Sequence, residues 1–124
     1  MHKLVLIGCG RISFKHIEAA VGNVESIKLV ACCDPVKERA ELRASEYMKS
    51  VPAAVVNSYT DYRKMLDTEK PDICAIATES GYHPQIAIDC LTAGCHVICE
   101  KPMALSTKDA DAMINAAEIG RAHV

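Results

Sequence analysis

The feature that most constrains this chain is an apolar run, close to the N-terminus, that stops at a pair of glycines. The run covers residues 3–7 and reads KLVLI, and the glycines are Gly8 and Gly10. A second apolar pattern, with helical spacing, begins at Ile12. This order predicts a strand over 3–7, a tight turn at the glycines, and a helix over 12–21.

The glycine turn has the form of a phosphate-binding loop. Glycine permits turn conformations that other residues resist, and it lets a ligand's phosphates approach the backbone. The N-terminus of the helix that follows offers free N–H groups and a partial positive charge. The dinucleotide-binding fingerprint has Gly or Ala at a third position, where this chain has Ser13. Taken alone, the turn is either a dinucleotide site or an ordinary strand-to-helix connection.

An acidic residue stands where such a site requires one. The apolar run over 27–33 ends at Asp34, which follows Ser13 by about 20 residues. A carboxylate at this place accepts hydrogen bonds from the ribose hydroxyls of adenosine. Asp34 is also a good helix N-cap, with Pro35 as the first helical residue, and both roles can hold at once. The matched spacing of the two motifs favours dinucleotide binding.

Strands and helices alternate along the rest of the chain. The pattern predicts a helix over 36–49, a short strand near 54–56, a helix over 61–66 capped by Thr60 or Asp61, a strand over 72–77, a helix over 84–93 ended by Gly94, a strand over 96–99, and a helix over 106–118 capped by Ser106. We therefore expect an α/β fold, a doubly wound parallel sheet in three layers with strand order 3-2-1-4-5. A ligand would occupy the crevice between the first and fourth strands.

The charge and the hydropathy of the sequence argue against nucleic acid and membranes as partners. The net charge is −2 and no block of basic residues occurs, which argues against nucleic acid. No apolar run approaches the roughly 20 residues that span a bilayer. The N-terminus leads directly into the first strand, without the cleavage site of a signal peptide, so we expect a cytoplasmic protein without a membrane partner.

The chain has seven cysteines, and most of them lie inside apolar runs. Cysteine in such a run acts as a small hydrophobic residue, and an odd number argues against a closed set of disulfides. Cys95-His96 followed by Cys99 raises the alternative of a metal site. Because side chains alternate between the two faces of a strand, these groups are separated, and we predict no metal site.

Several further stretches carry a family resemblance. They are Gly81-Tyr82-His83-Pro84, the segment over 93–104 with Glu100-Lys101-Pro102 at its centre, the opening Gly8-Cys9-Gly10-Arg11-Ile12 with His16, and Cys33-Asp34-Pro35. Together they resemble the glucose–fructose oxidoreductase / inositol dehydrogenase family. The resemblance covers essentially the whole chain and implies that residues 1–124 form an NAD(P)-binding Rossmann domain.

The resemblance implies a role for each of several residues. The residues expected to bind the cofactor are Gly8, Gly10, Arg11 and Ile12 at the pyrophosphate, Asp34 at the ribose, Thr78 and His83 beside the cofactor, Lys101 toward the nicotinamide, and Glu100. Lys101 is the expected catalytic residue, and Glu100 either orients it or contacts the ribose. The alternatives are a solvated cation for Arg11, a helix-cap residue for His83 and a surface lysine for Lys101. The resemblance also suggests a cis bond between Lys101 and Pro102.

The implied function is hydride transfer between nicotinamide and a secondary hydroxyl of a sugar, cyclitol or nucleotide sugar. NAD is expected rather than NADP, because the carboxylate of Asp34 repels a 2′-phosphate. The family's C-terminal substrate domain is expected to be absent from this chain, so the isolated chain is predicted to lack activity. The full-length enzyme is expected to bind a small polyol or sugar and to form a homo-oligomer.

Two other classes of function compete with this interpretation. The first is a non-catalytic NAD(P)-binding regulatory or sensing module on the same fold, and the intact Glu100-Lys101-Pro102 favours the enzyme over it. The second is a flavodoxin-like or response-regulator domain, against which Asp34 and the glycine turn argue. Glu79 and Ser80 depart from the loop that is commoner in the family, which leaves that contact with the cofactor open.

Overall fold

Strands and helices alternate in the folded chain, as the sequence predicts. The computed structural model describes residues 2–10, 13–78, 83–99 and 114. The elements are β1 (His2–Ile7), α1 (Phe14–Gly22), β2 (Ile27–Cys33), α2 (Lys37–Ser50), β3 (Asn57–Tyr59), α3 (Tyr62–Glu69), β4 (Ile73–Ile76), α4 (His83–Thr92) and β5 (His96–Cys99). The predicted helix over 106–118 and the Lys101–Pro102 bond lie outside the described residues.

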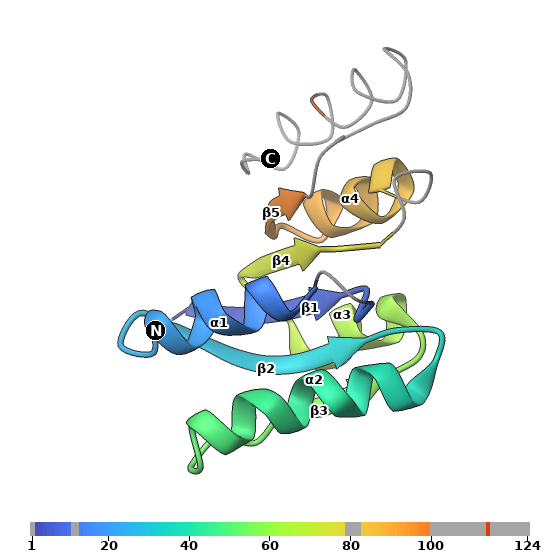
Figure 1. Cartoon of the computed structure of the whole chain (residues 1–124). Coiled ribbons are helices and arrows are strands. Elements are labelled where there is room, and N and C mark those ends of the chain that lie inside the picture. Colours follow the sequence, from blue (N-terminus) through green and yellow to red (C-terminus); the bar gives the residue numbers. More distant parts are fainter. Residues whose placement is uncertain (1, 11–12, 79–82, 100–113, 115–124) are drawn as a thin grey trace.

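The strands form one sheet with the order β3-β2-β1-β4-β5, and all four neighbouring pairs are parallel. Figure 1 shows this order from β5 at the top to β3 at the bottom. The predicted doubly wound sheet and its strand order are confirmed. After β3 the chain returns to the other side of β1, so the order reverses between β1 and β4. Ligands of open α/β sheets bind at such a reversal, outside the carboxyl ends of the strands.

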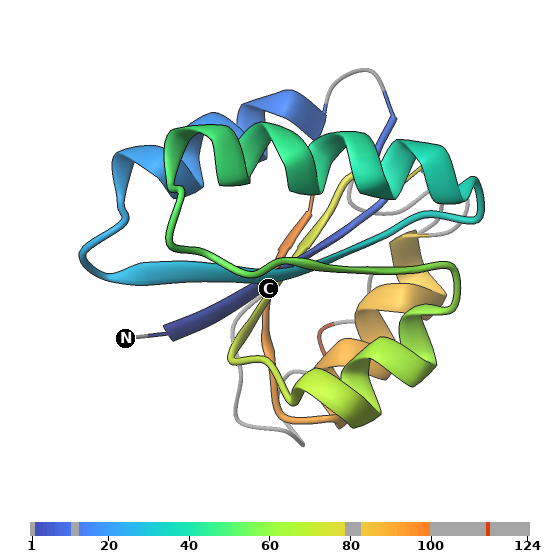
Figure 2. The same cartoon turned by 90° about the horizontal axis from the view of Figure 1, so that it is seen from below.

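The helices form two layers around the sheet. Helices α1 and α2 cover one face, and α3 and α4 cover the other, as Figure 2 shows. Side chains of β1 alternate between these layers: Leu4 and Leu6 pack on the side of α1 and α2, whereas Val5 and Ile7 pack on the opposite side. Burial on both faces explains why the central strands are nearly continuous apolar runs. None of the described helices has the length and hydropathy needed to cross a membrane.

Cysteine side chains fill both halves of this core. Free, buried thiols occur at Cys9, Cys32, Cys33, Cys74, Cys90 and Cys95. The prediction that cysteine serves here as a small hydrophobic residue is confirmed for these positions. The side chain of Cys99 lies outside the described part of the structure.

The start of α2 differs from the prediction. The helix begins at Lys37, with Val36 as its N-cap, so Asp34 is not the cap and Pro35 is not the first helical residue. The reason is local: the carboxylate of Asp34 accepts a hydrogen bond from the N–H of Val36 at 2.8 Å. This side-chain turn spans Pro35 and delays the helix.

The position of β3 was also predicted wrongly. The apolar run over 54–56 precedes the strand, which is Asn57–Tyr59 instead. Val55 is 72% exposed, so the run does not form a buried strand. β3 lies at the edge of the sheet and pairs with β2 through backbone groups, Ala31 opposite Asn57 and Cys33 opposite Tyr59. Backbone pairing does not require apolar side chains, and an apolar run was therefore a poor guide here.

Candidate functional site

Gly8 ends β1 in a conformation and at a place that only glycine suits. Its φ is +91°, and a Cβ on it would lie 2.6 Å from the backbone nitrogen of Thr78. Two hydrogen bonds hold the surrounding strand ends: the N–H of Gly8 donates to Cys33 O, and the N–H of Ala77 donates to Ile7 O, each at 2.8 Å. The missing side chain thus lets the end of β1 contact the end of β4 at the point where the strand order reverses.

Gly10, the second glycine of the turn, borders open space. No heavy atom of the described chain lies within 4 Å of a Cβ built on it, apart from its chain neighbours. The first turn of α1, which follows, carries no acidic residue. The partly exposed backbone of Gly10 and the positive end of a helix dipole fit the diphosphate of a dinucleotide.

Asp34 lies at the end of β2, beside the glycine turn, with its carboxylate fixed by backbone donors. The residue is 6% exposed. One carboxylate oxygen accepts from the N–H of Cys9 and the other from the N–H of Val36, both at 2.8 Å. A carboxylate has about four acceptor positions, so each oxygen retains capacity for a ribose hydroxyl. The geometry therefore fits the predicted role in ribose binding.

The thiols beside Asp34 are held in the neutral form. Hydrogen bonding with Cys32, together with burial, raises the pKa of the Cys9 thiol far above its ordinary value. Burial raises the pKa of the Cys33 thiol to about 12, with smaller contributions from Cys9 and Asp34. The thiolate is the nucleophilic form of cysteine, so neither thiol is activated for chemistry at this edge of the sheet.

A buried arginine from α2 joins the glycine turn, and sequence reasoning missed it. Arg43 is 9% exposed. Its Nε donates to the hydroxyl of Ser13 at 2.8 Å, and one terminal nitrogen donates to the carbonyl of Gly10 at 3.0 Å. The other terminal nitrogen donates to both carboxylate oxygens of Glu46, at 2.7 and 2.8 Å. The turn is therefore bonded to the neighbouring helix through a charged side chain.

The sequence did hold a signal for Arg43. The buried positions of α2 are Ala40, Arg43, Ala44 and Tyr47, which follow helical spacing. A charged residue within the apolar stripe of a helix is seldom buried without a partner. Its place in that stripe could have marked Arg43 as one end of a buried polar contact.

The structure brings together some of the predicted site residues. Gly8, Gly10, Asp34 and Thr78 lie at the carboxyl ends of β1, β2 and β4, and Thr78 contacts Gly8. His83 begins α4, but its side chain lies outside the described residues. The same is true of Arg11, Ile12, Glu100 and Lys101, whose roles stay predictions.

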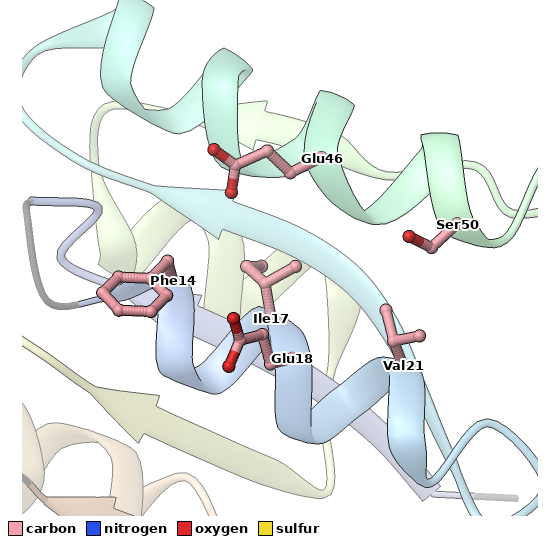
Figure 3. Close-up of a pocket in the computed structure, with 6 residues that line it drawn as sticks. All are labelled: Phe14, Ile17, Glu18, Val21, Glu46 and Ser50. Atoms are coloured by element: carbon pink, nitrogen blue, oxygen red, sulfur yellow. The ribbon is translucent and has the colours of Figure 1, made fainter.

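A groove elsewhere on the surface is a poor place for an anionic cofactor. It lies between α1 and α2, as Figure 3 shows, and encloses about 460 Å³. It is lined by Phe14, Ile17, Glu18, Val21, Glu46 and Ser50. Two of these side chains are carboxylates, which repel phosphate. The edge of the sheet at the glycine turn is the better candidate for a dinucleotide.

Comparison with known proteins identifies the family. Residues 2–122 match an oxidoreductase family with an NAD-binding Rossmann fold. The chain belongs to this family. The family predicted from the sequence is thereby confirmed, and NAD is confirmed as its type of cofactor.

Several relatives carry more specific names. The chain is 34% identical to D-apiose dehydrogenase of Paraburkholderia graminis over 116 residues, which are 94% of this chain and 29% of that protein. It is 28% identical to inositol 2-dehydrogenase of Salmonella typhimurium over 114 residues, 92% of this chain and 32% of that protein. Among solved structures, the WlbA dehydrogenase from Bordetella pertussis, in complex with NADH and UDP-GlcNAcA, superposes with a TM-score of 0.83 at 32% identity, covering 98% of this chain and 36% of that one.

The chain spans about a third of the length of these relatives. These relatives are named as dehydrogenases, which supports the interpretation of this chain as an oxidoreductase domain. Their names give no support to the alternative of a non-catalytic sensing module.

Proposed function

We propose that this chain binds NAD across the carboxyl ends of β1, β2 and β4, as the cofactor domain of a dehydrogenase that acts on a secondary hydroxyl of a sugar, cyclitol or nucleotide sugar. The observation that carries the proposal is the meeting of Gly8, Asp34 and Thr78 at the reversal of strand order. The substrate class rests on the relatives, whose names include D-apiose dehydrogenase and inositol 2-dehydrogenase. We also place the whole protein in the cytoplasm as a homo-oligomer.

Different residues would bind the diphosphate and the adenosine ribose of the cofactor. The backbone at Gly8 and Gly10, with the N-terminus of α1, would hold the diphosphate, and Arg11 and Ile12 would complete that contact. The carboxylate of Asp34 would accept the ribose hydroxyls of adenosine. Because a 2′-phosphate would meet the negative charge of Asp34, NAD is preferred over NADP.

Lys101 is the residue to which we assign chemistry. When bound, the nicotinamide ring supplies the acceptor for hydride from the substrate carbon. The substrate hydroxyl loses its proton as the carbon–oxygen double bond forms. In its ammonium form Lys101 would stabilise the developing alkoxide charge, and in its neutral amine form it would accept that proton and pass it on to solvent. Glu100 would orient Lys101, and Thr78 and His83 would line the cofactor.

The cofactor assignment is tested by titration of this chain with NADH and NADPH, with binding followed by calorimetry. We expect NADH to bind at least about tenfold more tightly, a difference of about 1.4 kcal/mol. Asp34→Ser should reduce this preference, and because the ratio of two affinities is compared, a partly unfolded variant does not distort the result. Equal or tighter binding of NADPH by the unaltered chain would overturn the assignment.

The reaction is tested in a protein that carries this chain together with the substrate domain expected for the family. A panel of cyclitols, sugars and UDP-sugars would be screened for NADH formation, and Lys101→Met should lower kcat on the active substrate. The chain alone should give no turnover, because the substrate must be held in attack geometry against the nicotinamide. Substrate-dependent formation of NADH by the isolated chain would refute this division of labour.

A further inference from the structure

Ser13 occupies the position where the dinucleotide fingerprint has a small apolar residue or glycine, and it is buried. It is 1% exposed. Its hydroxyl donates to the carbonyl of Gly10 at 2.6 Å and accepts from Nε of Arg43 at 2.8 Å. A buried hydroxyl is unfavourable unless it is hydrogen-bonded, and Arg43 supplies the second of these bonds. Ser13 and Arg43 therefore act as a pair.

The carbonyl of Gly10 is the common acceptor of this pair. It accepts from the N–H of Ser13 at 3.2 Å, from the hydroxyl of Ser13, and from Arg43 at 3.0 Å. A carbonyl oxygen has two lone pairs, so these donors occupy it fully. A carbonyl held in this way does not turn its negative end toward the open side of Gly10, where a phosphate would lie.

The charge of Arg43 is itself oriented. Its guanidinium donates to both oxygens of Glu46, three residues further along α2, and this ion pair leaves Nε and one terminal nitrogen directed at the turn. The pairing also offsets the cost of burying the cation. Because each of the three guanidinium nitrogens has its own partner, the plane of the group is fixed and, with it, the direction of the donors toward Ser13 and Gly10.

We propose that Arg43 is a positioning residue for the dinucleotide diphosphate, acting through Ser13 and the carbonyl of Gly10. It holds the turn in the form that presents glycine backbone, and no carbonyl oxygen, to the phosphates. This inference rests on the proposed function, since it concerns the same binding site. It assigns to a residue of α2 a role in recognition of the diphosphate, without contact to the ligand.

The test compares a ligand that has the diphosphate with one that lacks it. Affinities of this chain for ADP-ribose and for adenosine would be measured by NMR titration. We expect Arg43→Leu to weaken ADP-ribose about tenfold, or about 1.4 kcal/mol, and to change adenosine binding less than about twofold. Arg43→Lys, which retains the charge and some donors, should recover part of the loss.

The matched control is Arg39→Leu. Arg39 lies on the same helix but is exposed, so this variant removes the same charge without touching the turn. We expect both affinities to stay within about twofold of those of the unaltered chain. An equal effect of the Arg39 and Arg43 variants would mean that net charge alone matters, and would overturn the proposal.

Other outcomes are equally decisive. Unchanged binding of ADP-ribose by Arg43→Leu, or an equal loss for both ligands, would overturn the positioning role while leaving the proposed function intact. Failure of the unaltered chain to bind ADP-ribose would instead overturn the proposed function, and this inference with it. If circular dichroism shows that Arg43→Leu does not fold, Arg43→Gln, a smaller change that removes the guanidinium from Ser13 and from the carbonyl of Gly10, must show the same selective loss.

Discussion

Two clusters of charged side chains connect parts of this domain, and they differ in exposure. In the first, Arg43 of α2 bonds to the glycine turn, and its side chain is 11% exposed. In the second, Asp89 of α4 accepts from the hydroxyl of Tyr62, from Arg63 at 3.2 Å and from Gln85 at 3.0 Å. The side chain of Arg63 is 66% exposed. Both clusters have several hydrogen bonds, so the number of bonds does not distinguish them.

The burial of the arginine and its position distinguish the two clusters, since Glu46 is itself 35% exposed and Asp89 24%. An exposed ion pair contributes about 0–1 kcal/mol to stability, whereas leaving a buried polar group such as the Ser13 hydroxyl without its partner costs about 1–3 kcal/mol. The cluster around Asp89 joins α3 to α4 across the helix layer. The cluster around Arg43 lies under the turn that borders the candidate site. Hydrogen-bonded charged side chains therefore stabilise helix packing around Asp89 and hold the glycine turn in position around Arg43.

The largest expected effect is that of a methyl group on the buried turn. Gly8→Ala places a Cβ 2.6 Å from the nitrogen of Thr78 at a φ of +91°. Strain at this φ and overpacking each contribute about 1–2 kcal/mol or more, so we expect a loss of about 3 kcal/mol in the free energy of unfolding. Urea denaturation would measure it.

The matched control for this substitution is Gly94→Ala. Gly94 has nearly the same φ, +89°, but no described atom lies within 4 Å of a Cβ there. This variant should lose only the conformational part, about 1 kcal/mol. Equal losses at Gly8 and Gly94 would contradict the close contact between the ends of β1 and β4.

The two clusters can be compared directly by replacing one arginine in each and measuring the loss of stability. Arg43→Leu leaves Ser13 and Glu46 without a buried partner, and we expect a loss of about 2 kcal/mol in stability. Arg63→Leu removes an exposed pair and should lose less than about 0.5 kcal/mol. Both losses would be read from urea midpoints. Similar losses would mean that burial does not separate the clusters.

Alkaline pH should lower the free energy of unfolding mainly through buried thiols. Burial raises the pKa of Cys33 from 9.0 to about 12, so the unfolded chain loses this proton near pH 9 and the native chain retains it. The stabilisation is complete below pH 9 and declines as the pH rises toward 12, at about 1 kcal/mol between pH 9 and 10. Stability measured at pH 8, 9 and 10 tests this decline, and Cys33→Ala should make it shallower without abolishing it, because the pKa of the Cys9 thiol is raised as well.

Tyr59, which is partly buried at the margin of the core, provides the corresponding comparison. Its hydroxyl donates to Glu69, and this hydrogen bond is the main reason why its pKa is raised to about 12. The direction of the effect on stability is the same, but solvent screens the interaction. Tyr59→Phe should therefore flatten the alkaline decline less than Cys33→Ala, and the reverse order would contradict the account.

A small stabilising effect is expected at the end of α3, away from the glycine turn. Lys70 adopts a left-handed conformation with a φ of +47°. Glycine adopts it without strain, so Lys70→Gly should stabilise the fold by about 0.5–1 kcal/mol. Thermal denaturation would detect the gain. The affinity for NADH should not change, and a loss of affinity would show that this helix end affects the site.

Much of the fold could be predicted from the sequence because parallel strands that are joined by helices can be connected in few ways. Apolar runs separated by helical patterns predicted the strand order, and the spacing of Gly8 and Asp34 predicted which strand ends would meet. The family motifs added residues, such as Lys101, whose roles stay predictions.

What the sequence did not show depends on contacts between distant side chains. Arg43 was overlooked because a charged residue in a helix is usually solvated, and its partners Ser13 and Gly10 are far from it in the chain. The start of α2 was misplaced because it depends on a hydrogen bond that the N–H of Val36 donates to the carboxylate of Asp34 rather than on helix propensity. The edge strand β3 was misplaced because its pairing depends on backbone groups.

The most direct test of the central claim is to map NAD onto the isolated chain by NMR. Backbone amide shifts of the isotope-labelled chain would be followed during titration with NAD. We predict that the largest changes fall at Gly8, Cys9, Gly10, Asp34 and Thr78, with α3 unaffected. Changes centred on the groove between α1 and α2, or no saturable changes at millimolar NAD, would contradict it.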